Sequence, residues 1–143
     1  MIKQMSQDVT FARMVKISSE PVELPKEFLK VMGQNSNALM ILAVSTKTVR
    51  LIPTTSSEVI KVGIEIKKLT PEYLKQMSET FVKRNLKVVY STGFCYKGEK
   101  CVYEAYFDPA EIPMKDEELR KVLQSLEGTT KIDLRRINLE TTG

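Results

Sequence analysis

The chain has 143 residues, of which 42% are hydrophobic and 28% charged, with a formal net charge of +4, enough for one ordinary domain or two small ones with a packed core. The absence of histidine excludes Ser-His and Cys-His nucleophile pairs and histidine metal ligands, and two cysteines cannot close a zinc site alone. We therefore expect no catalytic residues, no metal and no cofactor, and a protein that is not an enzyme.

The first part of the chain predicts a small β unit at residues 1–55. Apolar and β-branched runs predict strands at residues 9–19, 22–24, 38–45 and 48–54. Pro25 fits the first position of a short helix over residues 26–32, and Gly33 can supply its left-handed C-terminal cap. A tight connection at Thr46 and Lys47 predicts a hairpin between the last two strands. Pro53 and the polar residues 54–57 then form a linker.

The second part, residues 58–140, alternates strands with amphipathic helices. Strands are predicted at residues 58–69, 86–94, 101–107 and 130–139, and helices at residues 71–85 and 115–128. Thr70, Pro71 and Glu72 form a helix start, with a cap, a proline at the first position and an acid at the positive end of the dipole. The order βαββαβ predicts a ferredoxin-like sandwich of four antiparallel strands under two helices, and the whole chain is α+β.

Two cysteines and a group of tyrosines lie on the predicted hairpin of this second unit. Cys95 and Cys101 flank residues 96–100 and would lie opposite each other, so a cross-strand disulfide, two buried free thiols and a redox switch all remain open. The tyrosines fit either packing on a sheet face or a base-stacking platform, as in RNA-binding sheets of this topology. They are Tyr90, Tyr96, Tyr103 and Tyr106.

Charge and hydropathy bear on partners and localisation. Residues 1–57 carry seven Lys or Arg against four Asp or Glu, whereas residues 58–143 carry fifteen against fourteen. The weakly basic first part is compatible with a nucleic-acid partner and equally with an ordinary solvated surface. The longest apolar run, residues 38–44, is far shorter than the ~20 residues of a membrane helix, and residues 1–10 lack the apolar core of a signal peptide. We expect a cytoplasmic protein without a membrane partner.

Residues 9–54 resemble the SpoVT/AbrB family of swapped-hairpin DNA-binding domains. The resemblance is carried by Leu-Pro-Lys-Glu at 24–27, Gly33 after the short helix, and Leu-Ile-Pro at 51–53. It implies a homodimer with interleaved hairpins that binds double-stranded DNA, because one such unit is too small to bury a core. The DNA contacts that it implies are Arg13, Lys16, Lys26 and Lys30. The family's Gly-Arg pair is replaced by Ser19-Glu20-Pro21, so a swapped hairpin that serves dimerisation alone is the alternative.

Residues 58–138 resemble ACT-type regulatory domains in topology. The resemblance implies a small-molecule effector at the first strand-to-helix loop, bound by the backbone N–H groups of Leu69 and Glu72 and the hydroxyl of Thr70. This loop lacks the glycine of ACT domains that bind amino acids, so a purely oligomerising role is the alternative. The full sequence predicts a dimeric transcriptional regulator with a C-terminal sensing or oligomerising domain. The alternative is an assembly or small-molecule-sensing protein that does not bind DNA.

Overall fold

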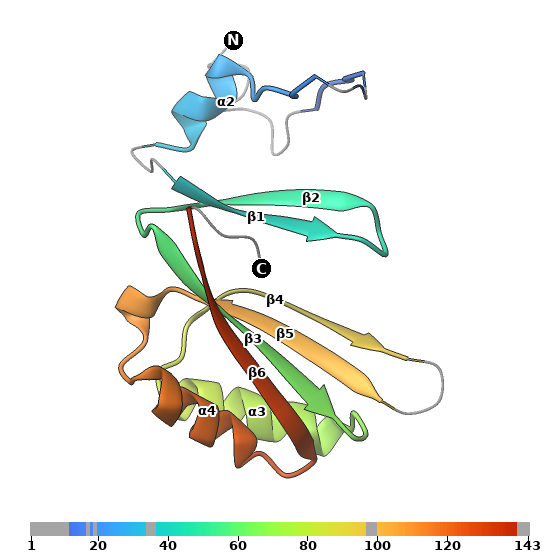
Figure 1. Cartoon of the computed structure of the whole chain (residues 1–143), viewed down its shortest axis with the longest axis vertical. Helices are drawn as coiled ribbons and strands as arrows, with labels where there is room; N and C mark the ends of the chain where they lie inside the picture. The colour runs from blue at the N-terminus through green and yellow to red at the C-terminus, as the bar shows by residue number, and fades with distance from the viewer. Residues whose placement is uncertain (1–11, 17, 19, 34–36, 97–99, 140–143) are drawn as a thin grey trace.

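The computed structural model describes residues 12–16, 18, 20–33, 37–96 and 100–139 (Figure 1). Their helices and strands are α2 (Lys26–Val31), β1 (Asn37–Ala43), β2 (Thr48–Thr54), β3 (Glu58–Ile66), α3 (Pro71–Lys83), β4 (Val88–Cys95), β5 (Cys101–Phe107), the 3₁₀ turn η1 (Pro109–Glu111), α4 (Asp116–Gln124) and β6 (Thr129–Asn138). The strands form a two-stranded sheet, β1-β2, and a four-stranded sheet in the order β4-β5-β3-β6. The predicted α+β class is confirmed.

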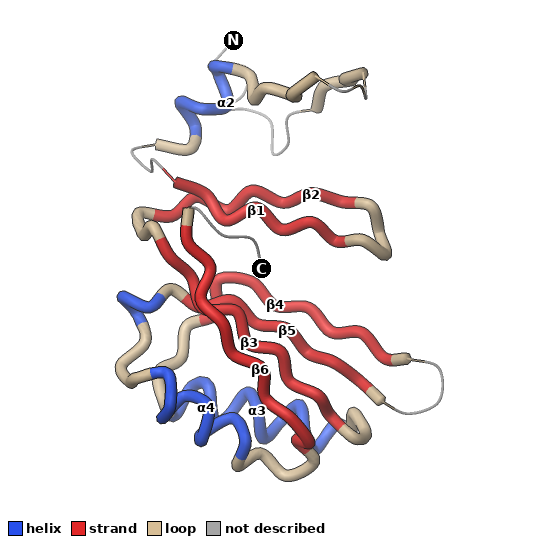
Figure 2. Tube along the Cα trace, viewed as in Figure 1, coloured by secondary structure: helices blue, strands red, loops and turns tan. Residues whose placement is uncertain are grey.

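The four-stranded sheet has the connectivity expected from the βαββαβ order. β3 lies at its centre and pairs antiparallel with β5 and β6, while β4 pairs antiparallel with β5. Helices α3 and α4 lie together on one side of this sheet, and the β1-β2 hairpin lies on the other (Figure 2). The arrangement is ferredoxin-like, with the hairpin as an additional third layer.

The core on the helix side follows from the alternation of β3. Its even-numbered residues from Ile60 to Ile66 are buried, and they pack with Phe107 of β5 and with Leu119 and Leu123 of α4. α3 begins as predicted: the Tyr73 amide donates to Thr70 Oγ1 at 3.1 Å, and Pro71 occupies the first turn. These contacts fix the end of β3 and the start of α3, which border the site described below.

A second core lies between the hairpin and the face of the sheet that the helices leave open. β1 alternates, and its inward residues Leu39 and Ile41 pack with Val59 of β3 and Tyr106 of β5. The hairpin connection spans residues 44–47, so it contains the predicted Thr46 and Lys47 but also Val44 and Ser45, which were expected in the strand. Lys47 adopts a positive φ of 55°. Because the hairpin and the sheet share this core, the predicted linker at 54–57 joins two packed layers; the division into units at 55 and 58 stays a prediction.

The start of the chain differs from the prediction. Residues 12–16, 18 and 22–24, which were expected in strands, are not in strands; residues 9–11, 17 and 19 lie outside the described part. A strand requires a neighbour that satisfies its backbone hydrogen bonds, and among the described residues none lies beside this segment. The short helix is correct: the Leu29 amide donates to the Pro25 carbonyl at 3.1 Å, and Gly33 has a φ of 74°.

Candidate functional site

A cavity of about 540 Å³ lies beside the first turn of α3. Two segments that are distant in the sequence form it: the β3-α3 loop and the turn between α4 and β6. They meet because β3 and β6 are hydrogen-bonded neighbours, and the Lys67 amide donates to the Gly128 carbonyl at 3.0 Å. The lining residues are Lys67, Lys68, Thr70, Glu72, Tyr73, Gln76, Glu127 and Gly128.

Tyr73 and Gly128 shape the inner wall of this cavity. The Tyr73 side chain is buried, and its hydroxyl shares a hydrogen bond of 2.8 Å with Thr129 Oγ1. Burial raises the pKa of the Tyr73 phenol, so this group is neutral near pH 7. Gly128 has a φ of 103°, and a Cβ there would lie 3.5 Å from the Tyr73 ring. The positive φ therefore favours glycine here, whereas a Cβ would make only ordinary contact with the ring.

The remaining lining residues carry both signs of charge. Lys67 and Lys68 face the same hollow as Glu72 and Glu127, and the amide of Gln76 adds a neutral donor and acceptor. All five side chains belong to exposed residues. Such a lining complements a small molecule that itself carries one positive and one negative group.

The structure places the predicted effector residues at this cavity in part. Thr70 and Glu72 line it, whereas Leu69 lies in the same loop but outside the lining. The prediction considered only one loop and noted that it has no glycine. Gly128 supplies a glycine from the opposite segment, and the adjacency of β3 and β6 was the signal that could have identified it.

The four predicted DNA contacts lie in the segment before the hairpin. Arg13, Lys16, Lys26 and Lys30 are exposed, and within the described part of the chain none of them forms an ion pair. Lys26 and Lys30 are four residues apart in α2, so they project from one side of this helix. The structure thus presents these cations to solvent.

The face of the hairpin that points away from the sheet is apolar along its whole length. In register, Ala38 pairs with Pro53, Met40 with Leu51 and Leu42 with Val49. We call these six residues the outer hairpin face. Met40 is 56% exposed and Leu42 is 62% exposed. The segment before the hairpin adds further exposed apolar side chains, namely Met14, Val15, Val22, Leu24, Leu29 and Val31.

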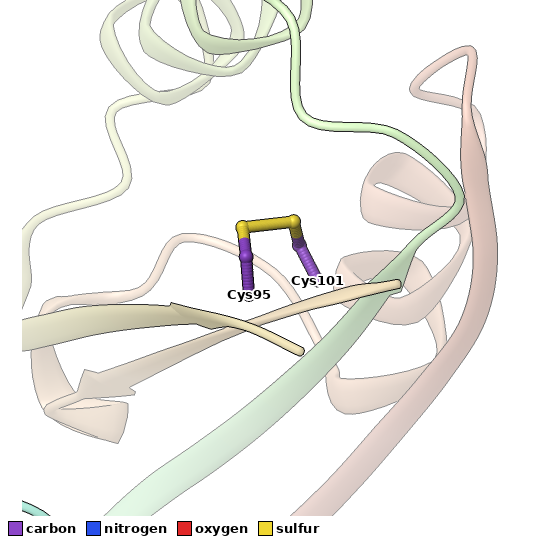
Figure 3. The surroundings of a disulfide bond; sticks show 2 residues. All are labelled: Cys95 and Cys101. Atoms are coloured by element: carbon purple, nitrogen blue, oxygen red, sulfur yellow. A yellow bond between two sulfur atoms is a disulfide. The ribbon is translucent and has the colours of Figure 1, made fainter. Parts of the chain in front are cut away.

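The two cysteines form a disulfide at the turn end of the β4-β5 hairpin (Figure 3). Cys95 and Cys101 are directly opposite in register, and their Cα atoms are 4.0 Å apart. Of the three interpretations from the sequence, two buried free thiols are therefore wrong. Cys101 belongs to the helix-side core, whereas Cys95 is exposed.

The tyrosines do not form a base-stacking platform. Tyr106 is only 7% exposed, and it packs in the second core with Tyr90 under the hairpin. The Arg50 guanidinium lies 5.5 Å from the centre of the Tyr90 ring and covers it further. Tyr103 packs against the helix-side core, and Tyr96 lies exposed beside Phe94. Sheet packing, the other interpretation from the sequence, accounts for three of the four.

Metal-ligand clusters and membrane-spanning helices find no support in the described ranges. There, no group of three or more Cys, Asp or Glu residues is arranged to hold a metal ion. No helix in the same ranges has the length and apolar character needed to cross a membrane.

Comparison with known proteins gives structural likenesses but no match by sequence. No protein-family model matches the chain, and no curated protein sequence matches it. Among solved structures, the chain is similar to the C-terminal domain of the MgtC protein from Mycobacterium tuberculosis, with 8% sequence identity and a TM-score of 0.46. The match covers 64% of this chain and all of that domain.

Proposed function

We propose that the chain is a homodimeric regulatory protein that associates through residues 12–54 and senses a small effector with its ferredoxin-like unit. The observation that carries the proposal is the outer hairpin face. A hairpin with one face on a core and the other in water normally alternates apolar with polar residues. Here the outer hairpin face is apolar although Leu39, Ile41 and Ile52 already pack on the opposite face, which is the pattern of a sheet that lies between two layers.

A second copy of the chain is the layer that best fits the missing side. A twofold interface buries the same patch of both subunits, so the patch must be able to pack against itself. The outer hairpin face can do so, because it is apolar throughout. The exposed apolar residues of the segment before the hairpin lie in the same region and lack cover in the single chain. Joining two copies would bury both sets of side chains at once, as the resemblance to swapped-hairpin domains also implies.

Sedimentation of the purified protein tests this association. We expect a dimer at micromolar concentration, and we expect Leu42→Asp on the outer hairpin face to weaken it by at least about tenfold, because the interface would then bury an unpaired carboxylate. Val82→Asp is the matched control, since Val82 is 83% exposed on α3, outside the proposed interface. A wild-type protein that remains monomeric and folded at these concentrations would contradict the proposal.

The effector is expected to be a zwitterion of amino-acid size, given the two lysines and two glutamates around the cavity. A panel of amino acids examined by thermal shift should contain one that raises the melting temperature in a saturable way, because binding to the native state stabilises it. Lys68→Gln and Glu72→Gln should each reduce this rise. Lys75→Gln on α3, outside the lining, should not. If no member of the panel stabilises the protein, the cavity has no such effector and the assembly role alone remains.

DNA binding is the second candidate, and the exposed cations before the hairpin favour it. A dimer would present two sets of Arg13, Lys16, Lys26 and Lys30. Affinity for any duplex should then fall steeply with salt, and Lys16→Gln should weaken binding to all sequences alike and reduce the salt slope by about one. Lys87→Gln, before β4, is the control. A wild-type protein with no salt-sensitive affinity for duplex DNA would exclude the transcriptional role and leave the dimeric sensor.

A further inference from the structure

We propose that the Cys95–Cys101 disulfide is reduced and re-formed in the folded protein, and that its redox state controls how firmly the β3-α3 loop is held. This loop borders the cavity, so reduction of the disulfide would also alter the binding of an effector there; that part of the proposal rests on the proposed function. The change in the loop itself is independent of the proposed function.

The disulfide has one accessible side and one buried side. Cys95 is exposed at the end of the edge strand β4, whereas Cys101 is 5% exposed and packs in the helix-side core. Figure 3 shows the bond spanning the ends of the two strands, next to β3. Beyond it, one backbone hydrogen bond, from the Tyr96 amide to the Lys100 carbonyl at 2.8 Å, continues the pairing. The disulfide is therefore the covalent cross-link that holds the ends of β4 and β5 together next to the turn.

This end of the sheet leads directly to the cavity. Cys101 is the register partner of Ile66 at the end of β3, and the next residue, Lys67, lines the cavity. The residues that precede this register pair in the chain, Glu65 and Lys100, form a side-chain ion pair. On the opposite side of β3 the pairing with β6 is irregular between Glu65 and Ile66. Residues 65–67 are thus held from both sides, by the pairing of Ile66 with Cys101 of β5 and by the hydrogen bond from the Lys67 amide to the Gly128 carbonyl.

The chemistry is ordinary thiol–disulfide exchange with a dithiol. A thiolate of the reductant attacks Cys95 Sγ, the Cys95–Cys101 bond breaks, and Cys101 leaves as a thiolate that takes up a proton. The second thiolate of the reductant then attacks the mixed disulfide, releases Cys95 as a thiolate that is protonated, and departs as an oxidised disulfide. The two electrons pass from the dithiol to the cysteines, and a disulfide oxidant reverses both steps.

The effect of reduction is expected to be local. The bond encloses only the residues between 95 and 101, so it constrains little of the unfolded chain beyond this turn. The helix-side core and the second core do not depend on it for their packing. Reduction should therefore loosen the strand ends and the β3-α3 loop without unfolding the protein.

Two measurements on the full chain test the proposal. Reduction by dithiothreitol, followed by maleimide labelling and mass spectrometry, should proceed at a rate proportional to reductant and unchanged by urea below the unfolding transition. Amide hydrogen exchange should then be roughly tenfold faster at Lys67 and Tyr96 in the reduced protein than in the oxidised protein. Amides of the β1-β2 hairpin, such as Leu42, should exchange equally in both.

Cys95→Ser is the matched variant, because it removes the bond and leaves the buried Cys101 in place. Its Lys67 amide should exchange as in reduced wild type and should not respond to dithiothreitol. Reduction that occurs only through global unfolding would overturn the proposal, and so would a Lys67 amide that exchanges equally in both redox states. If Lys67 responds but no amino acid stabilises either form, the effector site fails and the redox control of the loop stands.

Discussion

Residues 58–139 and residues 12–54 both contain apolar strands, but they differ in how completely the apolar side chains are buried. In β3, the residues that face the helices are buried to the last one, and the opposite face is partly covered by the hairpin. In β1, Leu39 and Ile41 are buried, whereas the outward residues that alternate with them, including Met40, are exposed to solvent. The difference lies in the number of layers that the single chain provides. The first region has a helix layer and a hairpin layer, and the second has a sheet on one side only.

Charge follows the same division. In the C-terminal unit, Arg136 of β6 bridges Asp116 of α4 and Glu58 of β3, so charged side chains tie the elements together. In the segment before the hairpin, the cations Lys26 and Lys30 have no carboxylate partner among the described residues. The C-terminal unit thus joins its elements partly by ion pairs, whereas the segment before the hairpin leaves apolar side chains and these cations exposed to solvent.

The largest expected effect is a difference in unfolding free energy between substitutions in the C-terminal unit and on the outer hairpin face. Phe107 is fully buried and packs edge-to-face with Phe81, with 5.8 Å between the ring centres. Phe107→Ala should lower the free energy of unfolding by about 3–5 kcal/mol, because it removes contacts and leaves a cavity. Met40→Ala on the outer hairpin face should change it by less than about 0.5 kcal/mol in the monomer. Urea denaturation followed by circular dichroism measures both, and equal losses would contradict the contrast.

A second prediction tests whether the hairpin and the sheet are one cooperative unit. Ile41 points into the second core, so Ile41→Ala should cost about 2 kcal/mol, while Leu42→Ala, one residue further and facing outward, should be nearly neutral in the monomer. Tyr90 and Tyr106 lie in that core and Tyr73 and Tyr103 at the helix-side core, so tyrosine fluorescence reports on both cores. A single transition by fluorescence and far-UV circular dichroism is expected. Two separate transitions would support independent units that divide near residue 55.

The sequence predicted the C-terminal unit well because its signals are local. Thr70 with Pro71 marks a helix start by hydrogen bonding within one turn, and the alternation of β3 identifies its buried face. The opposition of Cys95 and Cys101 follows from a short turn between two strands. In each case the residues that decide the structure are close to one another along the chain.

The predictions failed where the structure depends on contacts between residues that are far apart in the sequence. Residues 12–16 and 22–24 have strand-like composition, but a strand needs a neighbour, and composition does not supply one. Residues 38–43 of β1 are apolar on both faces, so alternation alone could not indicate that Leu39 would pack on the sheet and Met40 would not. The cavity combines Thr70 with Gly128, which meet only because β6 lies beside β3.

A third, smaller effect concerns the helix start that borders the cavity. Thr70→Ala should cost about 1 kcal/mol, because the Tyr73 amide loses its hydrogen-bond acceptor. Thr70→Ser keeps the oxygen and should restore most of this stability. If Thr70 also contacts the proposed effector, Thr70→Ala should additionally abolish the ligand-induced rise in melting temperature, and thermal shift of both variants separates the two roles. A loss of stability equal in Thr70→Ala and Thr70→Ser would contradict the cap.

The smallest expected effect, and one that depends on pH, concerns the charges that tie α4 to β6. Asp116 accepts hydrogen bonds from Arg136 Nη2 at 2.8 Å and Nε at 3.0 Å, and these bonds hold the pKa of the Asp116 carboxyl below its usual 3.8. A carboxyl whose folded pKa is depressed stabilises the fold above its unfolded pKa, and this contribution is lost as the pH falls through the folded value. Because both side chains are more than a third exposed, solvent screening limits the contribution to about 0.5 kcal/mol.

Asp116→Asn should therefore unfold at a lower urea concentration than wild type at pH 7, and this gap between the two urea midpoints should narrow as the pH falls below 3.8. Glu118→Gln is the control, since Glu118 lies in the same first turn of α4 but has no ion-pair partner among the described residues. A gap for Asp116→Asn that is no larger than that of Glu118→Gln would show that the helix dipole rather than Arg136 accounts for the effect. A gap that persists in acid would contradict both electrostatic explanations, because protonation of the carboxyl removes its interaction with Arg136 and with the dipole alike.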